Sequence, residues 1–156
     1  MTIRNTKHAS FTIERVYPAT SARVFAAWSS KEAKTAWAYC HEEWPVSEHV
    51  FDFRVGGREY IVTGPAGGTR HIVNAHYFDI VPDQRIVYAY DMHLDDRHIS
   101  VSLATVEFFP VAGGTRLVLT ELGAFLDGYD DFAGREEGTR IGLANLARLF
   151  SQQRAA

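Results

Sequence analysis

Cysteine is almost absent from this chain, and its scarcity excludes two kinds of structure. Cys40 is the only cysteine among 156 residues, so neither an intrachain disulfide nor a cluster of metal-binding thiolates can form. A lone thiol of this kind is usually inert. The formal net charge is −3 and no run of Lys or Arg forms a basic stripe, which argues against nucleic acid or an anionic membrane surface as a partner.

Long apolar runs are missing as well. No segment approaches the roughly 18 apolar residues of a membrane span, and the polar residues 1–10 lack the apolar region of a secretory signal. Hydrophobic residues make up 46% of the chain and charged residues 22%, which is typical of a folded protein. We therefore expect a cytoplasmic protein in which residues 1–156 form one domain, with its core at about 10–152.

The residue pattern predicts one strand followed by two short helices. β-branched and aromatic residues dominate 11–17 and favour a strand. Thr20 or Ser21 can cap the first helix. Ser29 and Glu32 have the spacing of a capping box, so a second helix is expected to begin at Ser29.

A strand-rich region follows an irregular connection at 38–47. Segments 50–54 and 58–63 flank Gly56 and Gly57, and Gly-Gly is typical of a two-residue hairpin turn. In that register Phe53 faces Tyr60 and Phe51 faces Val62. The expected inner face of this hairpin is Phe51, Phe53, Tyr60 and Val62, with Asp52, Arg54 and Glu59 on the outer face.

Four more strands and a long helix complete the pattern. The strands are expected at about 70–81, 85–94, 100–109 and 115–121, and a loop at 123–131 precedes a helix that ends near residue 152. Leu143, Leu146, Ala147 and Phe150 give this helix one apolar stripe. Short turns between successive strands imply an antiparallel meander, and the helix must bury its stripe on the concave face. The expected fold class is α+β.

Several motifs along this order carry a family resemblance. They are Pro18-Ala-Thr with Val24, Phe25 and Trp28; Phe51-Asp-Phe-Arg-Val-Gly-Gly57; Asp79-Ile-Val-Pro82 with Arg85-Ile-Val-Tyr88; Ser102 to Phe108; Gly114-Thr-Arg-Leu117; Thr120-Glu-Leu-Gly123; and Arg135 to Arg140. Together they resemble the START-like superfamily, also called SRPBCC or Bet v 1-like. Within it, the chain looks like the branch related to the C-terminal domain of the activator of the heat-shock-protein-90 ATPase.

The resemblance implies a helix-grip fold, in which a curved sheet of about seven strands holds a long C-terminal helix, and an apolar pocket between the two. It says little about chemistry, because the superfamily includes lipid carriers, hormone receptors, cyclase domains and co-chaperone domains. Many relatives carry Gly-Trp near the start of the last helix, where this chain has Gly138-Thr139.

Aromatic residues on the expected inner face are candidates for a cavity that binds an apolar, aromatic or lipid-like molecule. The alternative is that they simply fill the core. The candidate lining is Trp37, Phe51, Phe53, Tyr60, Tyr77, Tyr88, Tyr90, Glu121, Phe125, Leu143 and Leu146.

Glu121 and His71 are the candidates for catalysis. A carboxylate among apolar neighbours has a raised pKa and can act as an acid or base. The alternative is a solvated position at the rim of the sheet. The chain has seven histidines, but no His-Glu-x-x-His motif and no helical ligand spacing, so we expect no metal site. Nucleotide-binding and nucleophile-elbow motifs are also lacking, and we expect no cofactor.

Three functions remain open at this point. The leading hypothesis is a small-molecule-binding domain without strong catalytic activity. The second is a cyclase-like or hydrolytic enzyme that uses Glu121, His71 or tyrosine hydroxyls. The third is a co-chaperone-like module whose partner is a chaperone, and a homodimer is also open.

Overall fold

The computed structural model describes residues 3–39 and 41–154, with side chains to residue 151, so Cys40 lies outside the described residues. The strands are β1 (Thr6–Tyr17), β2 (Val46–Phe51), β3 (Arg58–Thr63), β4 (His71–Val81), β5 (Arg85–Leu94), β6 (Arg97–Val111) and β7 (Gly114–Leu126). The helices are α1 (Ser21–Ser29), α2 (Lys31–Trp37) and α3 (Phe132–Arg154).

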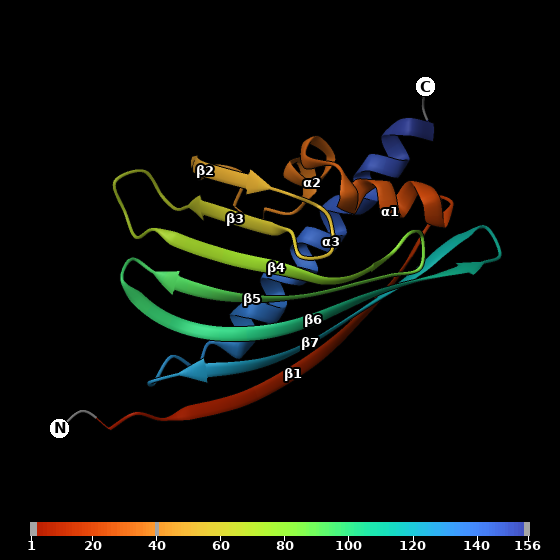
Figure 1. Cartoon of the computed structure of the whole chain (residues 1–156). Coiled ribbons are helices and arrows are strands. Elements are labelled where there is room, and N and C mark those ends of the chain that lie inside the picture. The colour runs from red at the N-terminus through yellow and green to blue at the C-terminus, as the bar shows by residue number, and fades with distance from the viewer. Residues whose placement is uncertain (1–2, 40, 155–156) are drawn as a thin grey trace.

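The seven strands of the described part form one antiparallel sheet with the order β1-β7-β6-β5-β4-β3-β2. The sheet is curved, and α3 crosses behind it while α1 and α2 cover one end (Figure 1). The predicted α+β helix-grip fold is therefore confirmed.

Side-chain caps fix where the helices begin. The Thr20 hydroxyl accepts a hydrogen bond from the Arg23 amide at 3.3 Å, as expected for the first helix. The expected capping box at Ser29 is wrong, because the cap of α2 is Ser30, whose hydroxyl accepts from the Ala33 amide at 3.3 Å. The Ser29 hydroxyl instead donates to a carbonyl of the preceding turn.

The expected register of the first hairpin is also wrong. Phe51 pairs with Glu59 rather than with Val62, a shift of an odd number of residues that reverses the two faces of β3. A loop over 52–57 replaces the two-residue turn, because the backbone of Gly56 and Gly57 bonds to Tyr77 of β4 at 2.9 and 3.0 Å. Glu59 consequently points to the concave face, and the expected inner residues Tyr60 and Val62 lie on the convex face.

Strand β7 runs further than expected, through residues that the pattern assigned to a loop. Its end is paired on both sides, Leu126 with Thr6 of β1 and Phe125 with Ser100 of β6. Gly123 permits this packing, since a Cβ there would lie 2.8 Å from the Phe125 ring.

The hydrophobic core lies between the sheet and all three helices. The expected stripe of α3 is confirmed, since Leu143, Leu146 and Phe150 are buried against the core cluster. The Tyr17 hydroxyl of β1 donates to the Leu143 carbonyl at 2.9 Å and fixes α3 to the far edge of the sheet. Among the described helices, none is both long and apolar enough to cross a membrane.

Candidate functional site on the concave face

Three tyrosines form a row on the concave face. Tyr77 of β4 pairs with Tyr88 of β5, and Tyr90 follows on the same face of β5. The ring centroids lie 6.0 Å apart between Tyr77 and Tyr88 and 6.1 Å apart between Tyr88 and Tyr90. Tyr77 is buried, whereas Tyr88 and Tyr90 are half-buried. Side chains in the middle of the concave face are therefore more exposed than those of the core.

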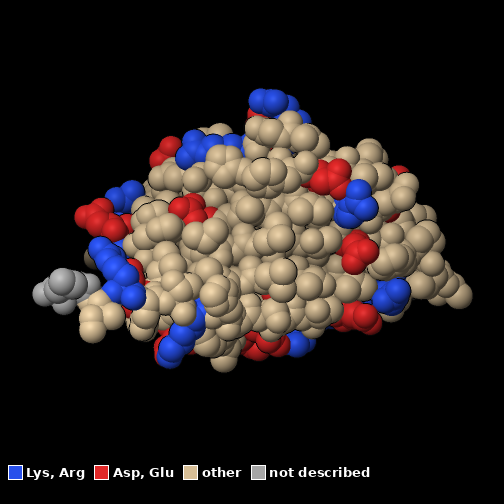
Figure 2. Space-filling model, turned by 60° about the horizontal axis from the view of Figure 1, so that its bottom comes forward, with Lys and Arg blue, Asp and Glu red and all other residues tan. Residues whose placement is uncertain are grey.

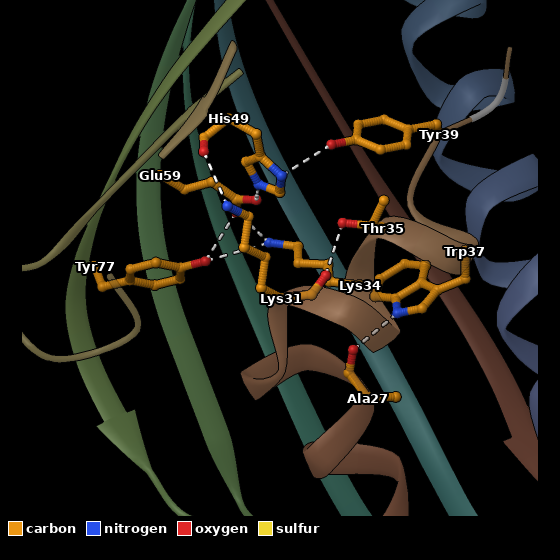
Figure 3. A network of polar contacts seen from close by, with 9 residues as sticks. All are labelled: Ala27, Lys31, Lys34, Thr35, Trp37, Tyr39, His49, Glu59 and Tyr77. Carbon is orange, nitrogen blue, oxygen red and sulfur yellow. Dashed lines mark hydrogen bonds and ion pairs between the residues drawn. The ribbon is translucent and has the colours of Figure 1, made fainter. Parts of the chain in front are cut away.

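One end of the row carries an ionic cluster around Glu59 (Figure 3). Lys34 of α2 forms an ion pair and hydrogen bond with Glu59 Oε1. The Tyr77 hydroxyl donates to the same oxygen at 3.0 Å, and His49 Nε2 of β2 lies 3.0 Å from Oε2. Tyr39 Oη lies 3.4 Å from the other nitrogen of His49. Both oxygens of this buried carboxylate thus have partners.

The surroundings of Glu59 set its charge. Burial alone would raise the pKa of Glu59, but the Lys34 ammonium and the hydrogen bonds from His49, Lys34 and Tyr77 lower it to about 2. Lys34 Nζ also lies 5.8 Å from the centroids of the Tyr77 and Tyr88 rings. At neutral pH this end therefore holds an ionised carboxylate matched by an ammonium.

A second carboxylate cluster occupies the other end of the row. The Tyr90 hydroxyl lies 2.9 Å from both oxygens of Glu121, and Arg135 Nη1 of α3 lies 4.0 Å from Glu121 Oε2. Arg135 also donates to the hydroxyl of Ser100 at 2.8 Å and to that of Ser102 at 3.3 Å. Arg135 Nη1 also donates to the Tyr90 hydroxyl at 3.3 Å, so Arg135 anchors the first turn of α3 to β5, β6 and β7.

Glu121 differs from Glu59 in its electrostatics. Burial raises the pKa of Glu121, and the Tyr90 hydrogen bond and the Arg135 charge offset this only in part. Burial and the nearby Glu121 carboxylate raise the pKa of Tyr90, so its hydroxyl is protonated. Glu121 also borders a pocket of about 80 Å³ between β1, β7 and the start of α3, where Phe11, Phe125 and Phe132 form apolar walls.

The Tyr88 hydroxyl stands between the two clusters and makes no hydrogen bond to any described residue. Burial, followed by the charge of Glu121, holds the pKa of Tyr88 well above its usual range, so the group is a protonated donor. The Tyr88 side chain is half-buried, so its hydroxyl is free to donate a hydrogen bond to solvent or to a ligand.

The opposite, convex face has a shallow groove of about 520 Å³ across β1, β7, β6 and β5. Val101, Leu103 and Leu122 line it and are all exposed. Figure 2 shows a broad uncharged centre, with most Lys, Arg, Asp and Glu side chains toward the rim. The groove itself is lined mainly by apolar side chains.

Comparison with known proteins identifies the family. The family described as Activator of Hsp90 ATPase homolog 1-like protein matches residues 18–151. The chain belongs to this family. The START-like resemblance expected from the motifs is thereby confirmed.

Solved structures share the fold of this Activator of Hsp90 ATPase homolog 1-like chain. An uncharacterized protein from Rhizobium leguminosarum is 48% identical, with 97% of this chain and 99% of that chain covered and a TM-score of 0.92. A protein from Rhizobium loti is 46% identical, with coverages of 92% and 98% and a TM-score of 0.87. The AHSA1 protein from Silicibacter pomeroyi is 25% identical, with coverages of 93% and 99% and a TM-score of 0.76. None of the curated proteins matches the chain.

The sequence-based cavity residues of this family member fall into four groups. Phe51, Phe53, Tyr77, Tyr88, Tyr90 and Glu121 lie on or beside the concave face, Trp37, Leu143 and Leu146 are buried in the core, and Phe125 packs on Phe132 near the Glu121 pocket. Tyr60 is separated from them by the sheet.

His71 and Glu121, the two catalytic candidates, are not brought together. Glu121 lies in the cross-strand row that continues through Ala104 to Tyr88, whereas His71 pairs with Leu94 at the far end of β5. The centroid of the His71 ring instead lies 4.7 Å from the centroid of the Trp44 ring. Burial and the nearby His41 lower the pKa of His71 and favour its neutral form.

Sequence reasoning missed the polar residues that complete the two clusters. Lys34 and His49 were not singled out, and Glu59 was assigned to the outer face. Arg135 and Ser100 were not recognised either, because their contacts join α3 to β6 across 35 residues. The correct register of β2 and β3 would have revealed Glu59 beside His49, since Phe51 and His49 then share its face.

Proposed function

We propose that this chain is a small-molecule-binding domain whose ligand lies on the concave face against Tyr88. The observation that carries the proposal is the Tyr88 hydroxyl, a protonated donor that lies at the centre of an aromatic surface and has no hydrogen-bond partner among the described residues. Phe51 and Phe53 stack with centroids 6.0 Å apart, and Phe53 lies 5.0 Å from Tyr77, which continues this surface toward the loop at 52–57. An apolar site with one directed polar group suits a mostly apolar ligand.

The charges on this face favour a neutral ligand. Glu59 is matched by Lys34, and Glu121 lies close to Arg135. A charged ligand would therefore lose its hydration on binding, and neither carboxylate would be available to pair with it, because each already lies beside a cation. The expected ligand is a neutral aromatic or lipid-like molecule with one acceptor, such as a carbonyl or hydroxyl oxygen, near Tyr88.

The pocket beside Glu121 receives only part of such a ligand in this proposal. Its volume of about 80 Å³ is well below the roughly 300–1,000 Å³ of pockets for whole drug-sized molecules. A substituent would enter beside Phe125 and Phe132, while the body of the ligand would lie over the tyrosine row.

Ligand screening with a pair of tyrosine variants tests the proposal. Neutral aromatic ketones, phenols, sterols and fatty alcohols are screened for a rise in Tm of the full chain, which mass action predicts for a true ligand. Tyr88→Phe removes one hydroxyl that makes no protein hydrogen bond, so we expect unchanged stability and about three- to tenfold weaker binding. Tyr60→Phe, on the convex face, is the matched control and should bind like the wild type. A panel without any shift, or equal affinity of Tyr88→Phe and wild type, would overturn the proposal.

Acid–base catalysis on the bound molecule is a second candidate, favoured by the raised pKa of Glu121 beside the pocket. In that cyclase-like or hydrolytic alternative, Glu121 transfers a proton and Tyr90 positions it. Glu121→Gln should then abolish turnover of a bound compound while binding persists. Turnover that survives this substitution would eliminate Glu121 as the acid or base.

A protein-interaction role is the third candidate. It rests on the family description and on the exposed apolar groove of the convex face. A co-chaperone-like protein should stimulate the ATPase of Hsp90, and Leu122→Asp in the groove should remove the effect. The same variant should dissociate a homodimer if a second copy covers the groove, which sedimentation equilibrium can measure.

A further inference from the structure

Two imidazoles and a carboxylate converge on the convex face of the hairpin formed by β5 and β6. Asp91 and His93 are alternate residues of β5 and point to the same face, opposite to Tyr90. His93 pairs across the hairpin with His98 of β6. One ligand atom from each of the three side chains lies within 4.8 Å of the others.

A β-bulge brings His98 into this position. Met92 pairs with Ser100 and His93 with His98, so Ile99 has no counterpart on β5. Ile99 is buried, and the extra residue lets His98 point to the convex face beside His93. Bulges commonly redirect a side chain in this way.

The His98 side chain has an unusual polar environment. Its ring is stacked on that of His93, with centroids 4.4 Å apart and planes 9° apart. His98 Nε2 lies 3.1 Å from Asp91 Oδ2. Nevertheless this nitrogen is buried and makes no hydrogen bond within the described part of the chain. The His98 side chain is 40% exposed, and its Nε2 lies within ion-pair distance of the Asp91 carboxylate without the geometry of a hydrogen bond. A cation held between these two atoms would bind both of them.

We infer that Asp91, His93 and His98 form a binding site for a divalent late transition-metal ion, with Zn²⁺ as the representative. Around a tetrahedral Zn²⁺ with bonds of about 2.0–2.2 Å, neighbouring ligand atoms lie about 3.4 Å apart. The distance of 3.1 Å between His98 Nε2 and Asp91 Oδ2 is already close to this value. The two imidazole rings must rotate out of their stacked arrangement to bind the same ion, because the lone pairs of parallel rings lie in separate planes.

The donor set also selects the metal. Two imidazole nitrogens and one carboxylate oxygen suit Zn²⁺, Ni²⁺ or Cu²⁺, whereas Mg²⁺ and Ca²⁺ prefer oxygen ligands. Three protein ligands leave a coordination position for water or another donor. Because the three residues come from both strands of the hairpin, a bound ion would cross-link β5 to β6 and stabilise the folded chain.

Zn²⁺ titration of the full chain, after removal of metal by a chelator, tests the inference. We expect one ion per chain by native mass spectrometry and isothermal titration calorimetry. We also expect a rise in Tm of roughly 5–10 °C at a free Zn²⁺ concentration of 100 Kd. His93→Ala and His98→Ala should each weaken binding at least tenfold and remove the Tm shift.

His76→Ala is the matched control, because His76 is an exposed histidine on the same face of β4 and lies outside the cluster. It should bind Zn²⁺ like the wild type. Circular dichroism checks that each variant is folded, and His98→Gln replaces His98→Ala if the latter unfolds. Wild-type binding weaker than about 1 mM, or equal affinity of wild type and His93→Ala, would overturn the inference.

Discussion

Removal of the Lys34 ammonium should be among the most damaging single changes that this fold can suffer. Lys34 and Glu59 are only 11% and 4% exposed at their side chains, and they join α2 to β3. Lys34→Met keeps the apolar stem but leaves a buried carboxylate without its cation. Breaking a buried pair in this way costs about 3–5 kcal/mol, a large part of a total stability of about 5–15 kcal/mol.

The pKa of Glu59 gives an independent estimate of similar size. A fall from the ordinary value of 4.5 to about 2 corresponds to about 3 kcal/mol of stability. Because the pKa is lowered in the folded state, this contribution is present above pH 4.5 and is lost as the pH falls toward 2. In Lys34→Met, burial should dominate and raise the pKa of Glu59, so the deficit should shrink as the solution is acidified.

Urea unfolding at pH 7 measures the effect. Lys31→Met is the matched control from the same helix, since Lys31 is exposed and its ammonium donates to the His49 carbonyl at 3.2 Å. This variant should cost less than about 1 kcal/mol. The double variant Lys34→Met with Glu59→Gln should recover most of the loss, because no unmatched charge remains. A Lys34→Met variant within about 1 kcal/mol of wild type, or a double variant without recovery, would refute the reasoning.

Three further variants probe other parts of the fold. Glu121→Gln should raise Tm by a few degrees at pH 7, because burial raises the pKa of Glu121 and its ionised form opposes folding. The gain should vanish when acid protonates the wild-type carboxyl, and a Tm difference that does not depend on pH would contradict this. Tyr17→Phe removes the buried donor to the Leu143 carbonyl and should lower the free energy of unfolding in urea by about 1–2 kcal/mol. An unchanged free energy of unfolding would show that this hydrogen bond does not stabilise α3. Gly57→Ala would place a Cβ 2.1 Å from a backbone carbonyl oxygen. It should therefore lower the stability more than Gly56→Ala, where the positive φ of 83° costs about 1–2 kcal/mol. The reverse order of the two Tm values would disprove the close-contact argument.

Local patterns were sufficient to predict the element order and the stripe of α3. Leu143, Leu146 and Phe150 repeat at helical spacing, and each is buried as that spacing requires. The alternation in β4 and β5 likewise placed Tyr77 and Tyr88 on one face, which their pairing confirms.

Local sequence patterns could not predict the register in which β2 pairs with β3. Gly56-Gly57 is typical of a tight turn, but backbone bonds from these glycines to Tyr77, twenty residues further on, hold a longer loop. A three-residue difference in pairing then placed Glu59 inside and Tyr60 outside.

The sequence-based expectation of no metal site did not consider the cluster proposed above. It considered ligand spacings along one helix, whereas Asp91, His93 and His98 meet only through cross-strand pairing and the bulge at Ile99. No spacing rule for a single element can reveal such a cluster.

The pairing of β1 with β7 has a consequence for synthesis of the chain on the ribosome. Tyr17 pairs with Thr115 and Thr6 with Leu126, so the first strand has no partner until nearly the whole chain has been translated. At about 5–20 residues per second, that delay is several seconds or more. During this time the apolar side of β1 and both its edges are exposed, whereas β2 to β6 can already pair with their neighbours. Closure of the sheet is therefore a late event, and the unpaired first strand is open to pairing with other chains until β7 emerges.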